Sequence, residues 1–169
     1  IRRHNVTTQD PINTNISIQT GEQRNKWFEF ETTGQLTDRL NLVATYTYID
    51  AEVTKSTVAN LLGKRPILVA QNMANVWLRY DLIGWVPGVG FGAGARYIGN
   101  QAGNAENTSN VPSYTLFDAA VFYNTASWRF ALNGKNLANK QYIAGCASIN
   151  QCYPGDSRMV MLTANYSFK

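Results

Sequence analysis

The feature that most constrains this chain is an alternation of apolar and polar residues with a period of two, which recurs in eight separate segments. Residues 40–51 and 157–168 show it clearly, with apolar or aromatic side chains at every second position. Such a period places alternate side chains on opposite faces of a β-strand, whereas an amphipathic helix needs apolar residues three and four positions apart. We therefore predict eight strands, at residues 1–8, 24–33, 40–51, 72–82, 89–98, 114–123, 128–137 and 157–168.

Composition narrows the fold class without deciding it. The chain of 169 residues is 44% hydrophobic and 12% aromatic but only 15% charged, against a usual charged share of roughly 25%. No segment approaches the ~18 consecutive apolar residues of a membrane-spanning helix. A transmembrane β-barrel alternates its apolar residues with polar ones and fits this composition. A soluble β-sandwich shares the alternation, so both classes stay open at this point.

Charge and the metal-binding residue types exclude several function classes. The formal net charge is +4, and the Lys and Arg residues are scattered rather than gathered on one face, so we expect no nucleic-acid partner. Cys146 and Cys152 lack the C-x-x-C spacing of zinc or thioredoxin sites, and the single histidine, His4, is distant in sequence. We expect no metal site and no cofactor. The chain starts without Met and has no signal peptide, so we interpret it as an excerpt of a mature protein.

The connections between the predicted strands favour the membrane class. Short connections, at residues 34–39, 83–88 and 124–127, alternate with long ones at 9–23, 52–71, 99–113 and 138–156. Short turns on one rim and long loops on the other are typical of outer-membrane barrels, and a sandwich has no reason to sort its loops in this way. We therefore expect an all-β, antiparallel transmembrane β-barrel in the bacterial outer membrane, with long loops extracellular and the C-terminus periplasmic.

The sequence resembles the C-terminal barrel part of a TonB-dependent ferric siderophore receptor over essentially its whole length. The matching stretches are SIQTG at 17–21 before FEFE at 28–31, YTYIDAE at 46–52, GKRP at 63–66, GAGARYIG at 92–99, VPSYTLFD at 111–118, Asn136-Leu137 followed by Tyr142, and the closing strand. This resemblance implies a barrel of about 22 strands closed by a plug, of which residues 1–169 would be about the last eight strands. The plug and the TonB box would lie outside this chain.

The resemblance also implies function and partners. The protein would import a ferric siderophore across the outer membrane, contact outer-membrane lipid, act as a monomer, and draw energy from the TonB–ExbB–ExbD complex through the missing N-terminal region. Iron would arrive already chelated. Two alternatives remain open: a complete eight-stranded barrel with a structural or adhesive role, and an outer-membrane enzyme. No nucleophile–base pair or paired carboxylates support catalysis, so we expect no enzymatic activity.

Strand parity assigns side chains to the two faces of such a wall. The residues predicted to face lipid include Leu42, Leu78, Phe91, Val121 and Leu162. Charges are expected in the lumen, because a charge facing lipid at mid-depth would cost roughly 2–4 kcal/mol; they are Glu29, Glu31, Arg79, Asp81, Arg96, Asp118, Arg129, Lys135 and Arg158. Aromatic girdles are expected from Trp85, Trp128, Tyr166 and Phe168 at the inner rim and from Tyr97 and Tyr114 at the outer rim. The alternating Gly90, Gly92 and Gly94 predict either a close approach of the plug or relief of crowding.

The last long loop carries both cysteines. On the barrel topology it is extracellular, in an oxidising environment, so we expect a disulfide between Cys146 and Cys152. The bond would either hold aromatic side chains at the mouth for ligand or protect an exposed loop from proteolysis. A disulfide loop followed by the run Tyr153–Arg158 resembles receptors for hydroxamate siderophores such as ferrichrome or ferrioxamine. The predicted ligand contacts are Tyr142, Tyr153, Arg158, Gln71 and Gln101.

Overall fold

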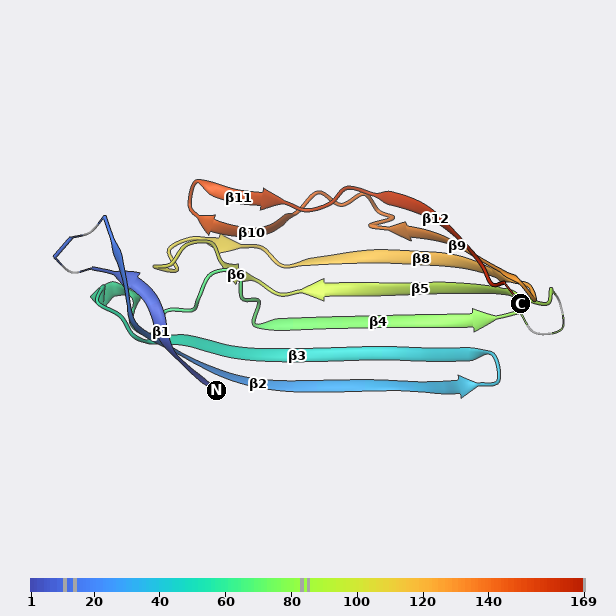
Figure 1. Ribbon diagram of the computed structural model, residues 1–169, viewed down its shortest axis with the longest axis horizontal. Helices are drawn as coiled ribbons and strands as arrows, with labels where there is room; N and C mark the ends of the chain where they lie inside the picture. The colour runs from blue at the N-terminus through green and yellow to red at the C-terminus, as the bar shows by residue number, and fades with distance from the viewer. Residues whose placement is uncertain (11, 14, 83, 85, 169) are drawn as a thin grey trace.

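The protein forms one large antiparallel sheet with two small hairpins at one end (Figure 1). The computed structural model describes residues 1–10, 12–13, 15–82, 84 and 86–168. The large sheet has eight strands in the order β1-β2-β3-β4-β5-β8-β9-β12, so the eight strands predicted from the alternation are confirmed. The strands are β1 (Arg2–Gln9), β2 (Ser17–Thr37), β3 (Leu40–Lys55), β4 (Asn72–Asp81), β5 (Val89–Ile98), β6 (Gln101–Ala102), β7 (Asn110–Val111), β8 (Tyr114–Asn124), β9 (Trp128–Lys135), β10 (Ile143–Ser148), β11 (Gln151–Pro154) and β12 (Met159–Tyr166).

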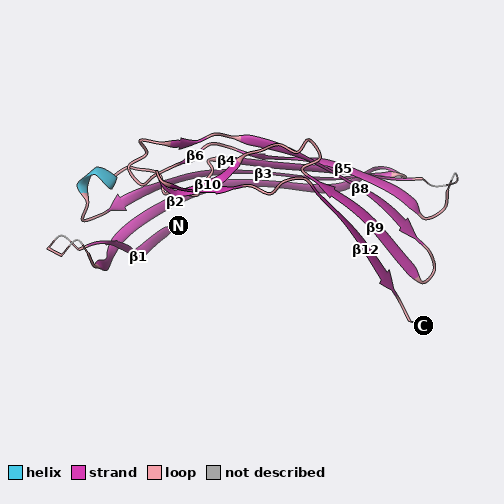
Figure 2. Cartoon of the chain, turned by 90° about the horizontal axis from the view of Figure 1, so that it is seen from above, coloured by secondary structure: helices cyan, strands magenta, loops and turns pink. Residues whose placement is uncertain are grey.

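The large sheet is a single bent layer. Each strand pairs with its neighbour in sequence, except that the β6–β7 hairpin is inserted between β5 and β8 and the β10–β11 hairpin between β9 and β12. Figure 2 shows the layer curving into an arc. Among the described residues, the other sheets are only the two-stranded hairpins β6–β7 and β10–β11. Within the described residues β1 and β12 are the two edges and do not pair with each other. A β-sandwich and a closed eight-stranded barrel are therefore both inconsistent with this arrangement.

Register divides the sheet into two chemically different faces. Directly paired residues point to the same side of an antiparallel sheet, and the pairs Leu42–Leu78 and Phe91–Val121 belong to one continuous side. We call this side the apolar face. Leu162 reaches it through Leu132, which pairs with Val121. The five side chains predicted to share one face therefore do so, as predicted.

The opposite side, which we call the polar face, carries the charges. Its members among the predicted lumen charges are Glu29, Glu31, Arg79, Asp81, Arg96, Asp118, Arg129 and Lys135. Arg158 departs from the prediction, because it precedes β12 and belongs to no strand. The ring of Trp77 on this face covers Gly92 and Gly94, where a Cβ atom would collide with it. The alternating glycines thus relieve crowding within the sheet.

Two strands are longer than the alternation predicted. β2 contains 21 residues, about twice the 9–11 residues that suffice to cross a membrane as a strand. The strand extends beyond the predicted 24–33 at both ends. Residues 17–23, where most side chains are polar, pair with β1 and with the end of β3, and residues 34–37 pair with the start of β3. Hydrophobic periodicity ends where both faces of a strand meet water, whereas backbone pairing can continue. The predicted loop 9–23 is accordingly mostly strand.

The long connections lie together at one end of the sheet, and the short turns and the C-terminus lie at the other (Figure 1). The connections contain more regular structure than expected: the two hairpins and the 3-10 turn Ala59–Leu61. Several of the buried apolar side chains lie among these connections or at their bases, namely Ala70, Ala102, Val111 and Cys146. In the part of the chain that the structure describes, no helix is long and apolar enough to cross a membrane.

Aromatic side chains form a cluster at the short-turn end of the apolar face. Trp128 stacks on Phe130 with centroids 5.4 Å apart and contacts Tyr166 at 4.8 Å, and Tyr166 meets Phe168 edge to face. This agrees with the predicted girdle positions, except that Trp85 lies outside the described residues. Tyr114 was predicted to belong to the other girdle, and that prediction is wrong. It pairs with Ile98 on the polar face, because its position is even, whereas the residues of β8 on the apolar face, such as Phe117 and Val121, are at odd positions.

Candidate functional site

The three long connections 56–71, 99–113 and 138–156 form one interlocked layer at the end of the sheet. Asn107 joins the first two, because its side-chain oxygen accepts the Arg65 N–H at 2.8 Å and its amide donates to the Arg65 carbonyl at 2.9 Å. Gln101 joins the second to the third by donating to the Ala144 carbonyl at 3.1 Å. Ile67 forms an isolated parallel bridge with Ala102. These loops are therefore held as a unit rather than projecting separately.

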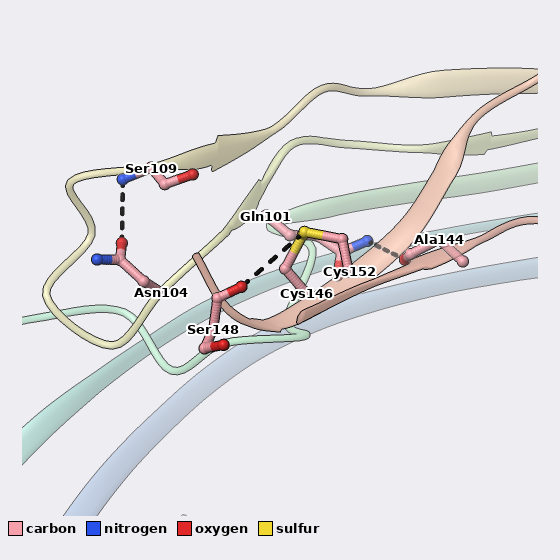
Figure 3. The surroundings of a disulfide bond; sticks show 7 residues. All are labelled: Gln101, Asn104, Ser109, Ala144, Cys146, Ser148 and Cys152. Atoms are coloured by element: carbon pink, nitrogen blue, oxygen red, sulfur yellow. Dashed lines mark hydrogen bonds between the residues drawn. A yellow bond between two sulfur atoms is a disulfide. The ribbon is translucent and has the colours of Figure 1, made fainter. Parts of the chain in front are cut away.

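The disulfide closes the β10–β11 hairpin of this layer. Cys146 and Cys152 are directly paired in the β10–β11 ladder and are bonded through their Sγ atoms, which confirms the predicted bridge. Figure 3 shows the bond beside Gln101, whose amide reaches Ala144 on the same hairpin. Cys146 is buried, at 4% exposure. The bond thus fixes the hairpin at the point where it rests on the neighbouring loop.

The base of the same loop is fixed by an asparagine. Asn136 is 2% exposed; its amide donates to the carbonyls of Lys140 and Asp156, and its oxygen accepts the Lys140 N–H, all at 2.9 Å. These bonds join the two ends of connection 138–156. The Asn136 N–H in turn donates to Asp118 Oδ1 at 2.9 Å. The loop is therefore anchored to the polar face of the sheet.

Tyr142 and Tyr153, the two predicted aromatic contacts, have different environments. The Tyr142 ring packs against Tyr114 with centroids 4.2 Å apart and also fills the space next to Gly155, where a Cβ atom would collide with it. The Tyr142 ring thus helps to attach the loop to the sheet through its contact with Tyr114. Tyr153 is 47% exposed on β11, opposite Gly145. Of the two rings, that of Tyr153 is free to meet a ligand without disturbing the loop.

The two predicted glutamines already have partners within the protein. Gln71 donates to the Tyr48 hydroxyl at 3.2 Å and accepts from Arg65 at 3.3 Å. Gln101 is 5% exposed and bonds to the third loop. Their observed contacts join loops, and a ligand contact by either one stays a prediction. Both glutamines therefore belong to the interlocked layer.

Arg158 is exposed just before β12, and its backbone N–H donates to Asn139 Oδ1 at 3.0 Å. The guanidinium is therefore available to an anionic group. In the part of the chain that the structure describes, no group of three or more His, Cys, Asp or Glu side chains could hold a metal ion.

Sequence reasoning missed the residues that join the loops, above all Asn107, Asn136 and Tyr114. Asn107 and Asn136 have positive φ values of 57° and 49°, a conformation that asparagine tolerates better than most residues. That preference was the available signal, because Asn107 lies within a predicted connection and Asn136 lies next to one. Their partners could not be identified in advance: Asn107 bonds to Arg65 in another loop, and Asn136 bonds to both ends of a connection whose path the local sequence does not reveal.

Comparison with known proteins places these features in context. The sequence model of the TonB-dependent receptor-like, beta-barrel family matches residues 1–137. The ferrioxamine receptor of Yersinia enterocolitica is 37% identical over 158 residues, which are 89% of this chain and 22% of the relative. The ferrichrome outer membrane transporter/phage receptor of Escherichia coli K12 is 34% identical, over 99% of this chain and 23% of the relative.

A solved structure shows the same likeness in three dimensions. The crystal structure of the siderophore receptor PiuA from Acinetobacter baumannii superposes with a TM-score of 0.79 at 30% identity, over 98% of this chain and 25% of that one. The chain thus spans about a quarter of the length of the proteins it matches.

Proposed function

Because this chain belongs to the TonB-dependent receptor-like β-barrel family, we propose that the complete protein imports a ferric siderophore through the bacterial outer membrane. The observation that carries this proposal is the division of one curved sheet into an exposed apolar face and a charged polar face. A wall between lipid and a polar lumen needs such a division. Residues 1–169 would supply about the last eight strands of that wall.

The two ends of the sheet support a proposed placement in the membrane. The apolar face contacts lipid and the polar face lines the lumen. The end with the interlocked loops faces the outside, and the end with short turns and the aromatic cluster lies at the periplasmic boundary. Tryptophan and tyrosine favour the membrane interface, which supports assigning Trp128 and Tyr166 to that boundary.

The proposed ligand is a ferric siderophore of the hydroxamate type. The names of the ferrioxamine and ferrichrome relatives support this class. The siderophore itself chelates the iron, so the protein contributes no metal ligands. Tyr153 would offer an aromatic surface and Arg158 a positive charge at the mouth. Tyr142, Gln71 and Gln101 would act beside them, and their present contacts would position the loops around the ligand.

We further propose that the plug and the TonB-contacting segment precede these residues in the complete protein and couple it to the TonB–ExbB–ExbD complex. On this proposal the barrel acts as a monomer and as a transporter without catalytic activity. The disulfide and the interlocked loops would restrict the mouth before ligand arrives. A restricted loop loses less entropy on binding than a flexible one.

The test compares two exposed positions of the disulfide hairpin in the full-length receptor. Tyr153→Ala should weaken binding of a ferric hydroxamate by about 5- to 30-fold, the equivalent of roughly 1–2 kcal/mol for one truncated aromatic contact. Ile149→Ala is the matched control, because Ile149 is 66% exposed at the hairpin tip and carries no predicted role. Binding is measured by quenching of intrinsic fluorescence, and uptake with radioactive iron in cells.

Adding Tyr142→Ala to Tyr153→Ala should deepen the loss to about 30- to 1,000-fold if ligand buries both rings. Tyr142→Phe removes only the hydroxyl and keeps the ring that packs on Tyr114. It therefore separates a ligand contact of the hydroxyl from the packing of the ring. Surface abundance is measured alongside, since a folding defect would mimic lost uptake. Normal binding of both hydroxamate and catecholate chelates by the double variant, at normal abundance, would contradict the proposed site.

A further inference from the structure

Arg129 lies on the polar face, where the described residues give it no acidic partner. Two other basic residues of that face have one: Arg79 pairs with Asp81 at 2.9 Å, and Arg96 pairs with Asp118 at 2.6 Å. Within the described residues of β4, β5, β8, β9 and β12, no carboxylate lies within ion-pair distance of Arg129. Its neighbours in register are the uncharged Asn124 and Asn165. The sheet itself therefore leaves this positive charge uncompensated.

The residue lines a hollow at the short-turn end of the polar face. The hollow has a volume of about 490 Å³. Its other polar lining groups are Arg79, Asn124, Thr125 and Asn165. Guanidinium, amide and hydroxyl groups all offer hydrogen-bond donors. The hollow thus gathers donors and positive charge at one place.

Arg79, the second guanidinium of the hollow, is held in place from two directions. Its Nε and Nη2 atoms donate to the same oxygen of Asp81, at 3.0 and 2.9 Å. Its guanidinium carbon also lies 4.8 Å from the centre of the Phe122 ring, within the range of a cation–π interaction. A guanidinium fixed in this way is preorganised to meet an anion, because less side-chain freedom is lost on binding.

We propose that this hollow, which we call the Arg129 pocket, receives a carboxylate side chain from the protein segment that fills the barrel lumen. The proposal rests on the proposed function, in which a plug occupies the lumen of a barrel of about 22 strands. Filling the lumen removes water from the wall, and an arginine buried without a counter-charge is strongly unfavourable. A carboxylate matches a guanidinium by charge and by bidentate geometry. An Asp or Glu of the plug is therefore the occupant that the chemistry selects.

A zero-length cross-link tests the contact directly in the full-length receptor. Arg129→Lys keeps the positive charge and introduces an amine that a carbodiimide can join to a carboxylate in contact with it. We expect mass spectrometry to find the peptide containing position 129 linked to an acidic peptide of the plug. Arg39→Lys is the matched control: Arg39 is an exposed cation in a turn at the same end of the sheet, outside the pocket.

Hydrogen exchange measures the consequence of losing the charge. Arg129→Glu should speed exchange at least tenfold in the linked plug peptide, whereas Arg39→Glu should leave it unchanged. Binding of a ferric hydroxamate is measured in the same samples. Loss of hydroxamate binding bears on the siderophore proposal alone, because the cross-link reports the plug contact whatever ligand the receptor takes.

Three results would overturn the proposal. The first is a cross-link from position 129 only to Asp81 or to another residue of the wall. The second is identical plug exchange in Arg129→Glu and Arg39→Glu. The third combines two observations: inorganic phosphate stabilises the parent protein but not Arg129→Gln, and position 129 gives no cross-link to the plug. This result would identify a site for a small soluble anion instead.

Discussion

Arg96 and Asp118 join β5 to β8 through two hydrogen bonds, from Nε to Oδ2 at 2.6 Å and from Nη2 to Oδ1 at 3.3 Å. The same carboxylate accepts the N–H of Asn136, at 2.9 Å, at the start of the disulfide loop. One ion pair of the wall thus positions the base of the loop that is proposed to bind ligand.

Asn136→Ala should loosen connection 138–156 while leaving the sheet assembled. The change removes three side-chain hydrogen bonds, each with a net value of about 0.5–1.5 kcal/mol, and places alanine at a φ of 49°. We expect the loop to lose about 2–4 kcal/mol of local stability, seen as faster hydrogen exchange. Asn136→Gly keeps the backbone freedom and isolates the effect of the amide; exchange as slow as in the parent in both variants would contradict the assigned role.

The disulfide should be complete in isolated outer membranes. Alkylation in denaturant without reductant should label neither Cys146 nor Cys152, and alkylation after reduction should label both. Because the ring is small, the bond should contribute on the order of 2 kcal/mol to the hairpin. The pair of changes Cys146→Ser and Cys152→Ser should therefore hasten protease cleavage near the exposed Ile149. Labelling of both cysteines before reduction would contradict the predicted disulfide.

Arginine should be tolerated on one face of β3 and not on the other. Leu42→Arg places a charge on the apolar face and should reduce barrel assembly, at a cost of roughly 2–4 kcal/mol near mid-membrane. Thr45→Arg places it on the polar face, opposite Glu31, and should assemble normally. Heat-modifiable migration on gels measures assembly. Lipid exposure of a spin label at position 45 instead of 42 would show that the assigned faces are reversed.

Gly92→Ala should destabilise the wall because its Cβ atom would collide with the Trp77 ring. Overpacking of this kind typically costs about 1–3 kcal/mol. Trp77→Val removes the colliding ring atoms, so Gly92→Ala should cost far less in that background. Urea unfolding of the two single variants and the double variant gives the coupling energy. Additive effects would mean that the ring and the glycine do not share this space.

Asn107→Ala should uncouple the first two loops of the interlocked layer. It removes both hydrogen bonds to the Arg65 backbone, so exchange at the Arg65 amide should rise by about tenfold, the equivalent of roughly 1.4 kcal/mol. Asn104→Ala is a useful comparison, because the Asn104 side chain forms hydrogen bonds with Glu106, Thr108 and Ser109, all within its own loop. An equal rise at Arg65 in both variants would indicate general loosening of the 99–113 loop.

The sequence by itself determined the sheet and its faces. Alternation identified the eight strands, and parity placed Leu42 and Thr45 on opposite sides, because side-chain direction in a strand depends only on position along the backbone. The spacing of Cys146 and Cys152 within one short loop likewise made their pairing predictable. These are local properties, and local sequence carries them.

Only the tertiary structure decided how the loops meet and what lies free at the mouth. Asn107 bonds to Arg65 and Gln101 to Ala144, each across about forty positions of sequence, and no local pattern encodes such pairs. Tyr142 and Tyr153 were equivalent in sequence, yet one ring packs on Tyr114 and the other is exposed. The uncompensated charge of Arg129 likewise became visible only once register placed Asn124 and Asn165 beside it. Contacts of this kind depend on how separate turns and strands pack in space, which alternation along one strand does not contain.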